Sequence, residues 1–205
     1  MVRSLDPADF RRVLLLNAHA ELTGGEAERR AAYAGILDEV AGSVETEADA
    51  AAILARVPEA IGCRMAPFGW MWNGFYVLRE DGNLHVGPAC GPPVCALLER
   101  ARGGRDGPLT SGMCFDGLIL NQTLVAWSAK DWPGYVSCDA TSGLRTVAGI
   151  VVPLRDARGR PIAVWDLDAS EPVLPGDVRF FDVLFATLAR CLALRPASFS
   201  SPAVR

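Results

Sequence analysis

The sequence of 205 residues predicts an α+β fold: an antiparallel sheet with helices packed on one face. Apolar residues recur at helical spacing in about the first sixty residues and again near the C-terminus. The middle of the chain instead holds two pairs of strand-like segments, each pair joined by a turn that contains glycine. Helices at both ends with hairpins between them indicate that helices cover one sheet face. The opposite face is then where a ligand pocket would form.

Three helices are expected before the first strand. The first covers residues 6–22 and starts with Asp-Pro, which suits a helix cap and first turn. The second covers residues 26–40, with apolar residues at helical spacing, and a Gly-Ser pair ends it. The third covers residues 46–57 and opens with a weak capping pattern, and Pro58 is expected to end it.

The rest of the chain is expected to form two hairpins and a final helix. The expected segments are strands 70–78 and 84–86, a short helix 94–101, strands 147–154 and 161–167, and a helix 177–194. We expect residues 1–58 to be a helical segment that packs on a domain of residues 59–195. The Pro/Ser-rich residues 196–205 are expected to be a disordered tail.

Composition and charge exclude several classes of protein. Half of the residues are hydrophobic and 21% are charged, which indicates a chain with a sizeable core. The net charge of −4 argues against a nucleic-acid-binding protein and gives no reason to expect binding to anionic membranes. No apolar run approaches the length of about 18 residues that a transmembrane helix needs, and no signal peptide is recognisable. We therefore expect a cytoplasmic protein.

The sequence contains no motif for a metal or a nucleotide cofactor. Its two histidines, His19 and His85, lie far apart, and there is no CxxC or HExxH. A P-loop and a GxGxxG are absent as well. We therefore expect neither a metal site nor an organic cofactor, and we interpret His85, beside a hairpin turn, as a surface residue.

The cysteines are the main candidates for chemistry. There are six of them: Cys63, Cys90, Cys95, Cys114, Cys138 and Cys191. In a cytosolic chain of this length they indicate catalytic, redox or metal-binding thiols, or ordinary core residues. Free cysteine is among the most buried residue types, so we interpret Cys63, Cys90 and Cys191 as buried structural residues. For the other three the structural interpretation stays open.

Several distinct motifs follow one another along the middle of the chain. They are WNGFY at 72–76, GPACGPPVC at 87–95, GMC at 112–114, PGYVSCD at 133–139, IVVPL at 150–154 and WDLDAS at 165–170. In order and local sequence they are similar to motifs of the free methionine-(R)-sulfoxide reductases, which are GAF domains. This resemblance covers roughly residues 30–192. It implies a GAF-like antiparallel sheet with helices on one face and a ligand pocket on the other.

The resemblance also assigns roles to three thiols. Reduction of a sulfoxide begins when a thiolate attacks sulfur, which yields a sulfenic acid that a second thiol captures as a disulfide. By resemblance Cys138 is the nucleophile and Cys95 the resolving thiol. Cys114 is an auxiliary thiol or a second resolving thiol. A thioredoxin-like dithiol would then reduce the pair.

Four further residues are candidates for binding the substrate. The ammonium of an amino acid is bound by acidic side chains and aromatic faces. We expect Asp166 and Asp168 to supply the carboxylates, and Trp72 and Tyr76 to wall the pocket. Because they alternate along a strand, Asp166 and Asp168 are expected on opposite faces unless the strand ends there. The alternatives are core packing for the two aromatic residues and turn formation for the two aspartates.

The chain departs from the family pattern around the pocket. Gly149 stands where the family places a glutamate that helps to bind the substrate's amine, and Ser128 stands where it has an acidic residue. The loops 95–114 and 140–148 are longer than in the family, and Arg145 lies in the second. Three residues are candidates to restore the lost carboxylate: Glu99, Asp116 and Asp139.

Two functions from different classes are therefore predicted. The first is an enzyme that reduces free methionine-(R)-sulfoxide or a related small sulfoxide through a sulfenic acid and an intramolecular disulfide. The second is a non-catalytic GAF domain that senses a small molecule or the redox state. A partner-binding role, such as a homodimer through the helices, is a third alternative.

Overall fold

The computed structural model describes residues 5–47, 49–100, 112–133, 143–192, 194 and 196–199. Within them the strands form a six-stranded sheet in the order β3-β2-β1-β6-β5-β4. All neighbouring strands pair antiparallel, which confirms the predicted α+β class. The strands are Trp70–Leu78 (β1), Leu84–Cys90 (β2), Leu97–Leu98 (β3), Leu124–Ala126 (β4), Ala148–Arg155 (β5) and Pro161–Ala169 (β6).

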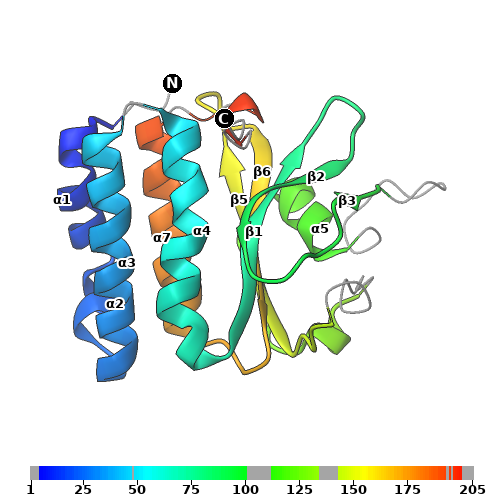
Figure 1. The fold of residues 1–205 in the computed structure, drawn as a ribbon, viewed down its shortest axis with the longest axis horizontal. Helices are drawn as coiled ribbons and strands as arrows, with labels where there is room; N and C mark the ends of the chain where they lie inside the picture. The colour runs from blue at the N-terminus through cyan, green and yellow to red at the C-terminus, as the bar shows by residue number, and fades with distance from the viewer. Residues whose placement is uncertain are drawn as a thin grey trace.

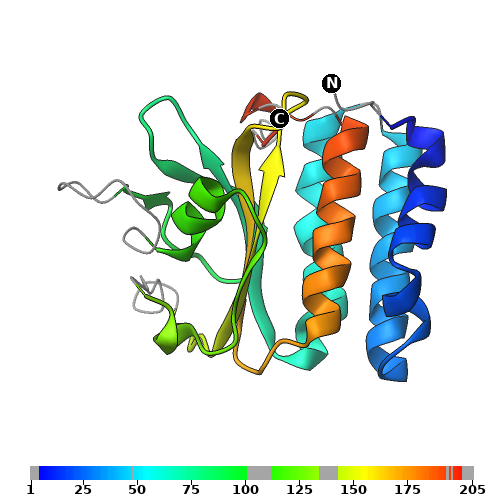
Figure 2. The same ribbon diagram turned by 180° about the vertical axis from the view of Figure 1, so that it is seen from behind.

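The helices lie on both sides of the sheet in unequal numbers. They are Pro7–Asn17 (α1), His19–Thr23 (α2), Ala27–Thr46 (α3), Ala50–Met65 (α4), Met113–Leu120 (α5) and Pro175–Leu192 (α7), with short 3₁₀ turns at Ala66–Phe68 (η1), Ala129–Asp131 (η2) and Pro196–Phe199 (η3). In Figures 1 and 2, α4 and α7 cover one face of the sheet, and α1, α2 and α3 form an outer layer behind them. Helix α5 and β3 lie on the opposite side.

The main hydrophobic core fills the space between the sheet and the helices. Trp165 of β6 lies at its centre, with ring centroids 4.9 Å from Phe181 and 4.8 Å from Phe185, both on α7. All three side chains are at most 1% exposed. Burial of a large apolar side chain stabilises a fold by about 1.5–3 kcal/mol, so these contacts hold α7 firmly to the sheet.

A buried ion pair joins the outer helical layer to the inner one. Arg29 of α3 donates from Nη1 to both carboxylate oxygens of Asp177, at 2.7 and 2.8 Å, and Tyr33 donates its hydroxyl to the same carboxylate. Asp177 also accepts the backbone N–H of Leu174 at 2.7 Å, which fixes the start of α7. The carboxylate is fully buried and well supplied with donors, as a buried charge must be.

The first helices differ from the expected bounds. The expected helix 6–22 is divided into α1 and α2, and the second helix continues past its Gly-Ser pair to Thr46. The third begins after Asp49, whose side chain accepts the N–H of Ala51, and it continues through Pro58 to residue 65. The expectation that Pro58 ends this helix is wrong, because apolar residues on both sides of the proline are buried against the sheet. The division at residue 58 stays a prediction.

Two expectations later in the chain are also corrected. Residues 94–100 form no helix, and β3 instead pairs with the start of β2. Residues 196–199, expected in a disordered tail, form η3, and Phe199 packs on Phe75 with 1% exposure. In the part of the chain that the structure describes, no helix is long and apolar enough to cross a membrane.

Candidate functional site

A cavity of about 250 Å³ opens on the sheet face that the helical layer leaves uncovered. Its walls come from β5 and β6, from the start of α5, and from the segment that contains β3. The lining residues are Tyr76, Cys95, Leu97, Leu98, Glu99, Gly112, Met113, Cys114, Ala126, Ala129, Thr146, Gly149, Asp166, Leu167 and Asp168. Five of the seven predicted site residues are among them.

Asp166 and Asp168 both face this cavity. The expectation that they lie on opposite faces is wrong, because residues two apart on a strand share a face. Their neighbours Trp165 and Leu167 point to the helical core instead. In the sheet, Asp166 pairs with Val151 and Asp168 pairs with Gly149 of β5.

Cys114 lies at the start of α5 and contacts Asp166. Its Sγ donates a hydrogen bond to Asp166 Oδ2 at 3.3 Å, and Cys114 is only 8% exposed. Burial, followed by the charge of Asp166, raises the pKa of the Cys114 thiol well above its ordinary value. Burial also raises the pKa of Asp166 to about 6. The pair therefore consists of a protonated thiol and a carboxyl group that titrates near neutral pH.

Cys95 lines the cavity and is disulfide-bonded. Its backbone carbonyl accepts a hydrogen bond from the Tyr76 hydroxyl at 2.9 Å, which ties the segment to β1. The other cysteines that the structure describes are free thiols: Cys63, Cys90, Cys114 and Cys191. Cys138, the predicted nucleophile, lies outside the described residues.

The two aromatic candidates occupy different positions. Tyr76 is 2% exposed and contributes directly to the cavity wall. Trp72 is 3% exposed, packs on Tyr76 with ring centroids 5.7 Å apart, and is not among the lining residues. Burial and the nearby charge of Asp166 raise the pKa of the Tyr76 hydroxyl, so it stays protonated and keeps its bond to Cys95.

The described cavity wall carries only acidic charge. Glu99 joins Asp166 and Asp168, and no arginine, lysine or histidine is among the described lining residues. The three carboxylates that line the described wall favour a ligand that carries a positive charge. Of the residues considered as replacements for a missing carboxylate, only Glu99 is found in the described wall.

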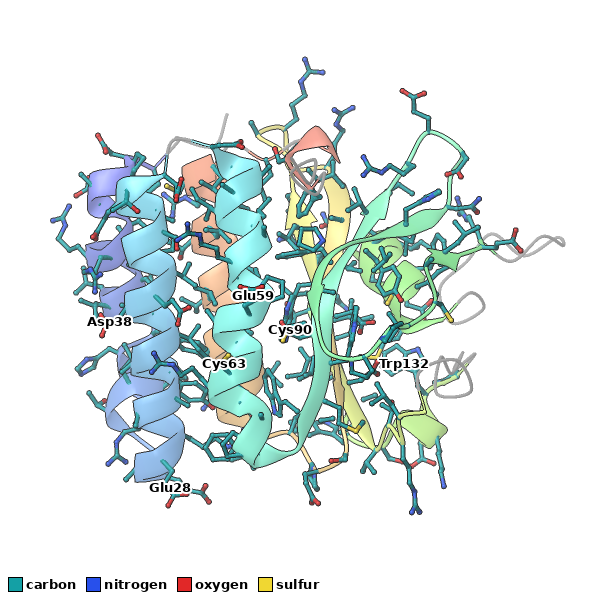
Figure 3. All side chains as sticks on the ribbon, in the orientation of Figure 1. Glu28, Asp38, Glu59, Cys63, Cys90 and Trp132 are labelled. Carbon is teal, nitrogen blue, oxygen red and sulfur yellow. The ribbon has the colours of Figure 1, made fainter. Side chains whose placement is uncertain are left out.

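Asp116 has a different role. It is fully buried and accepts a hydrogen bond from Trp132 Nε1 at 2.8 Å, and neither residue lines the cavity. Figure 3 labels Trp132 on the side of the sheet away from the helical layers. The third candidate, Asp139, lies outside the described residues.

Gly149 is required by the sheet itself. A Cβ built on this residue would lie 2.9 Å from the backbone oxygen of Leu167 on the neighbouring strand. Any side chain here therefore forces β5 and β6 to shift, because the obstructing atom belongs to the backbone. The cavity lacks a side chain at this point of its wall.

Sequence reasoning missed most of the uncharged wall. Ala126 lies at the end of β4, Ala129 in η2 and Thr146 just before β5, and Leu97 of β3 and Met113 of α5 line the cavity as well. Apart from Met113, which lies in the GMC motif, no motif marks these residues, because they belong to short elements and loops that meet only in the folded chain. The described residues contain no group of three or more side chains able to hold a metal ion.

No protein-family profile matches the chain, but several known proteins do. The chain is 26% identical over 151 residues to "GAF domain-containing protein A" of Dictyostelium discoideum. This match covers 74% of this chain and 84% of that protein. It is 29% identical over 99 residues to the free methionine-R-sulfoxide reductase of Escherichia coli strain K12. That match covers 48% of this chain and 51% of the Escherichia coli protein.

Solved structures that superpose on this chain also include GAF domains and free methionine-R-sulfoxide reductases. The free methionine-R-sulfoxide reductase of Neisseria meningitidis, in complex with its substrate, superposes with a TM-score of 0.66 at 24% identity, over 83% of this chain and 92% of that one. A putative GAF sensor protein from Burkholderia vietnamiensis gives 0.64 at 26% identity, over 80% and 94%. The chain therefore has the GAF fold and resembles the free methionine-R-sulfoxide reductases.

Proposed function

We propose that this protein is a thiol-dependent reductase of free methionine-(R)-sulfoxide or a closely related small sulfoxide. The observation that carries the proposal is that Cys95 and Cys114 line one cavity together with Asp166 and Asp168. The cavity thus combines thiols, which reduce a sulfoxide, with carboxylates, which bind the ammonium group of an amino-acid substrate. The similarity to free methionine-R-sulfoxide reductases supports the same activity.

The proposed reaction starts with Cys138. Its thiolate attacks the sulfoxide sulfur, the S–O bond breaks, and the oxygen is left on Cys138 as a sulfenic acid while the sulfide is released. Cys95 then attacks this sulfur, which forms a Cys95–Cys138 disulfide and releases water. Cys95 is disulfide-bonded, and the other four described cysteines are free. The proposed partner of Cys95 in this reaction is Cys138, as the resemblance to the free methionine-R-sulfoxide reductases implies.

Asp166 is proposed to supply the proton that the departing oxygen needs. Its pKa, raised by burial to about 6, leaves a usable fraction protonated near neutral pH. It lines the cavity, so it is able to contact a bound substrate. Cys114, held as a thiol against Asp166, is proposed to position this carboxyl and to serve as an auxiliary thiol.

The substrate's ammonium is proposed to bind between the carboxylates of Asp168 and Glu99. Both line the cavity, and the sheet provides no side chain at Gly149 to share the task. The ring of Tyr76 would contact the apolar part of the substrate, with Trp72 supporting it from behind. This arrangement suits a small molecule that carries an ammonium group.

A dithiol of the thioredoxin class is the proposed reductant. It would attack the Cys95–Cys138 disulfide, leave both cysteines as thiols, and itself become a disulfide. Such a cycle suits the cytoplasm, where thioredoxin systems keep thiols reduced. No metal or organic cofactor enters these steps. A homodimer through the outer helices is compatible with this reaction.

The direct test is turnover with dithiothreitol as the reductant. The (R) and (S) epimers of free methionine sulfoxide are compared, and methionine is quantified by chromatography. We expect turnover of the (R) epimer, no turnover of Cys138→Ser, and wild-type-like turnover of Cys191→Ser, which removes a thiol on α7 remote from the cavity. Full activity of Cys138→Ser would refute the mechanism.

A second function, a GAF sensor without turnover, is favoured by one observation. Gly149 leaves the cavity without the carboxylate that the resemblance leads us to expect there, and β6 leaves no room for one. A sensor would gain thermal stability on binding methionine or its sulfoxide, because ligand binds only the folded state. Stabilisation without any methionine formation in reduced, folded protein would establish this function instead.

A further inference from the structure

Two thiols lie together outside the cavity. Cys63 is an exposed residue near the end of α4, and Cys90 is the half-buried last residue of β2. Both are free thiols, and neither lines the cavity. The interpretation of Cys63 as a buried core residue is therefore wrong, and the pair needs its own explanation.

Close packing of α4 on β2 brings these cysteines together. A Cβ built on Gly62 would lie only 2.5 Å from the Sγ of Cys90, so the absence of a side chain at 62 lets the helix backbone contact this thiol. Cys63 is the next residue on the helix. Figure 3 shows Cys63 and Glu59 on α4 with Cys90 beside them at the sheet.

Electrostatic interaction between the groups is a second sign of proximity. The pKa of the Cys90 thiol is raised by burial, then by the charges of Cys63 and Glu59. Burial and the raised pKa therefore slow the reaction of Cys90 with reagents in solution. Cys63 is exposed to solvent, so its thiolate is able to attack a small disulfide in solution.

The surrounding hydrogen bonds hold the two elements in place. Asn73 of β1, the register partner of Cys90, donates from Nδ2 to the backbone oxygen of Pro58 on α4 at 3.1 Å. Its Oδ1 accepts from Trp165 Nε1 at 3.2 Å. The helix and the strand end are thus fixed to the centre of the sheet, so the two cysteines remain neighbours.

We propose that Cys63 and Cys90 form a second redox-active thiol pair that exchanges with low-molecular-weight disulfides. The Cys63 thiolate attacks such a disulfide, which gives a mixed disulfide on Cys63 and releases one small thiol. The Cys90 thiolate then attacks the Cys63 sulfur, forms the Cys63–Cys90 bond and releases the second small thiol. Two thiols of the protein are oxidised, and one small disulfide is reduced to two thiols.

The test uses oxidised glutathione and the full-length Cys95→Ser/Cys138→Ser protein, so that the proposed cavity disulfide does not form. Intact-mass spectrometry follows the reaction in time, and peptide mapping locates each bond. We expect a transient glutathione adduct on Cys63 that converts to a Cys63–Cys90 disulfide. Adding Cys90→Ser should stop the reaction at the adduct, and adding Cys63→Ser should leave Cys90 unmodified on the same timescale.

The matched control is Cys191→Ser, which removes a half-buried thiol whose pKa is likewise raised by burial. It should leave both the adduct and the intramolecular disulfide unchanged. A stable glutathione adduct on Cys63 with Cys90 present would overturn the proposal, as would equal oxidation of Cys90 after loss of Cys63. The readout requires no sulfoxide turnover, so it is independent of the proposed reductase activity.

Discussion

Cys114 Sγ donates a hydrogen bond to Asp166 Oδ2 at 3.3 Å in the wall of the cavity. The contact joins the beginning of α5 to the middle of β6, between residues that are 52 positions apart in the sequence. Burial, followed by the charge of Asp166, raises the pKa of Cys114 and keeps it protonated, and burial raises the pKa of Asp166 to about 6. The protonation of the Asp166 carboxyl group should therefore affect both the stability of the fold and the chemistry proposed for the cavity.

Replacing Asp166 should reveal this raised pKa as pH-dependent stability. In the folded protein the pKa of Asp166, about 6, lies above the ordinary value of an aspartate, so the stabilising contribution of the protonated form is lost as pH rises from about 4 through 6. Asp166→Asn mimics the protonated form. Its thermal midpoint should exceed that of wild type at pH 8 and match it near pH 4. Equal midpoints at both pH values would show that the pKa of Asp166 is ordinary.

Cys114 should be the slowest of the free thiols to react with iodoacetamide. It is buried and its pKa is raised, whereas Cys63 is exposed. Reduced protein is treated with the reagent for increasing times, and peptide mapping gives the labelled fraction of each cysteine. Cys63 should be modified first. Labelling of Cys114 as fast as Cys63, in protein shown to be folded by circular dichroism, would contradict the buried contact with Asp166.

A methyl group at position 149 should destabilise the sheet. Gly149→Ala places its Cβ 2.9 Å from the Leu167 carbonyl oxygen, and such overpacking costs about 1–3 kcal/mol of unfolding free energy. Gly42→Ala is the matched control, because no atom lies within 4 Å of a Cβ built there and the residue sits inside α3. That change should stabilise by about 0.5–1 kcal/mol. Urea unfolding measures both; an equal effect of the two would contradict the close approach at Gly149.

Breaking the buried ion pair should cost far more than breaking an exposed one. Asp177→Ala leaves Arg29 without its carboxylate and should cost about 3–5 kcal/mol. Asp9→Ala removes the partner of Arg12 in a pair whose side chains are 46% and 72% exposed, and should cost at most about 1 kcal/mol. Denaturant unfolding compares the two variants. A loss below about 1 kcal/mol for Asp177→Ala would mean that the inter-helix pair is not formed in solution.

Local patterns predicted the parts of the fold that depend on neighbouring residues. The hairpin strands follow from apolar and aromatic runs bounded by glycine turns, and β1 and β6 lie where these runs were found. The last helix was expected at 177–194 and is observed as α7. Pro58 was misjudged because packing against the sheet compensates for a break in helix bonding that the local sequence alone would favour.

The cavity was less predictable because tertiary contacts build it. Tyr76, Cys95, Cys114 and the two aspartates of β6 were candidate site residues, and all five line it, although the two aspartates were expected on opposite faces of the strand. The contact between the Tyr76 hydroxyl and the Cys95 backbone carbonyl leaves no trace in the sequence, nor does the obstruction at Gly149 by the backbone of β6. Residues 94–100 were expected to be helical, yet a short edge pairing with β2 decides their conformation.

Single-turnover reduction, without any added reductant, tests the central claim most directly. Fully reduced protein is mixed with excess free methionine-(R)-sulfoxide, and methionine and protein disulfides are measured in the same sample. The proposed mechanism predicts about one methionine per chain, with formation of a Cys95–Cys138 disulfide. Cys95→Ser should still yield methionine and should accumulate a sulfenic acid, whereas Cys138→Ser should yield none. If reduced, folded wild-type protein forms no methionine, the proposed reductase activity is contradicted and the sensor function becomes the remaining proposal.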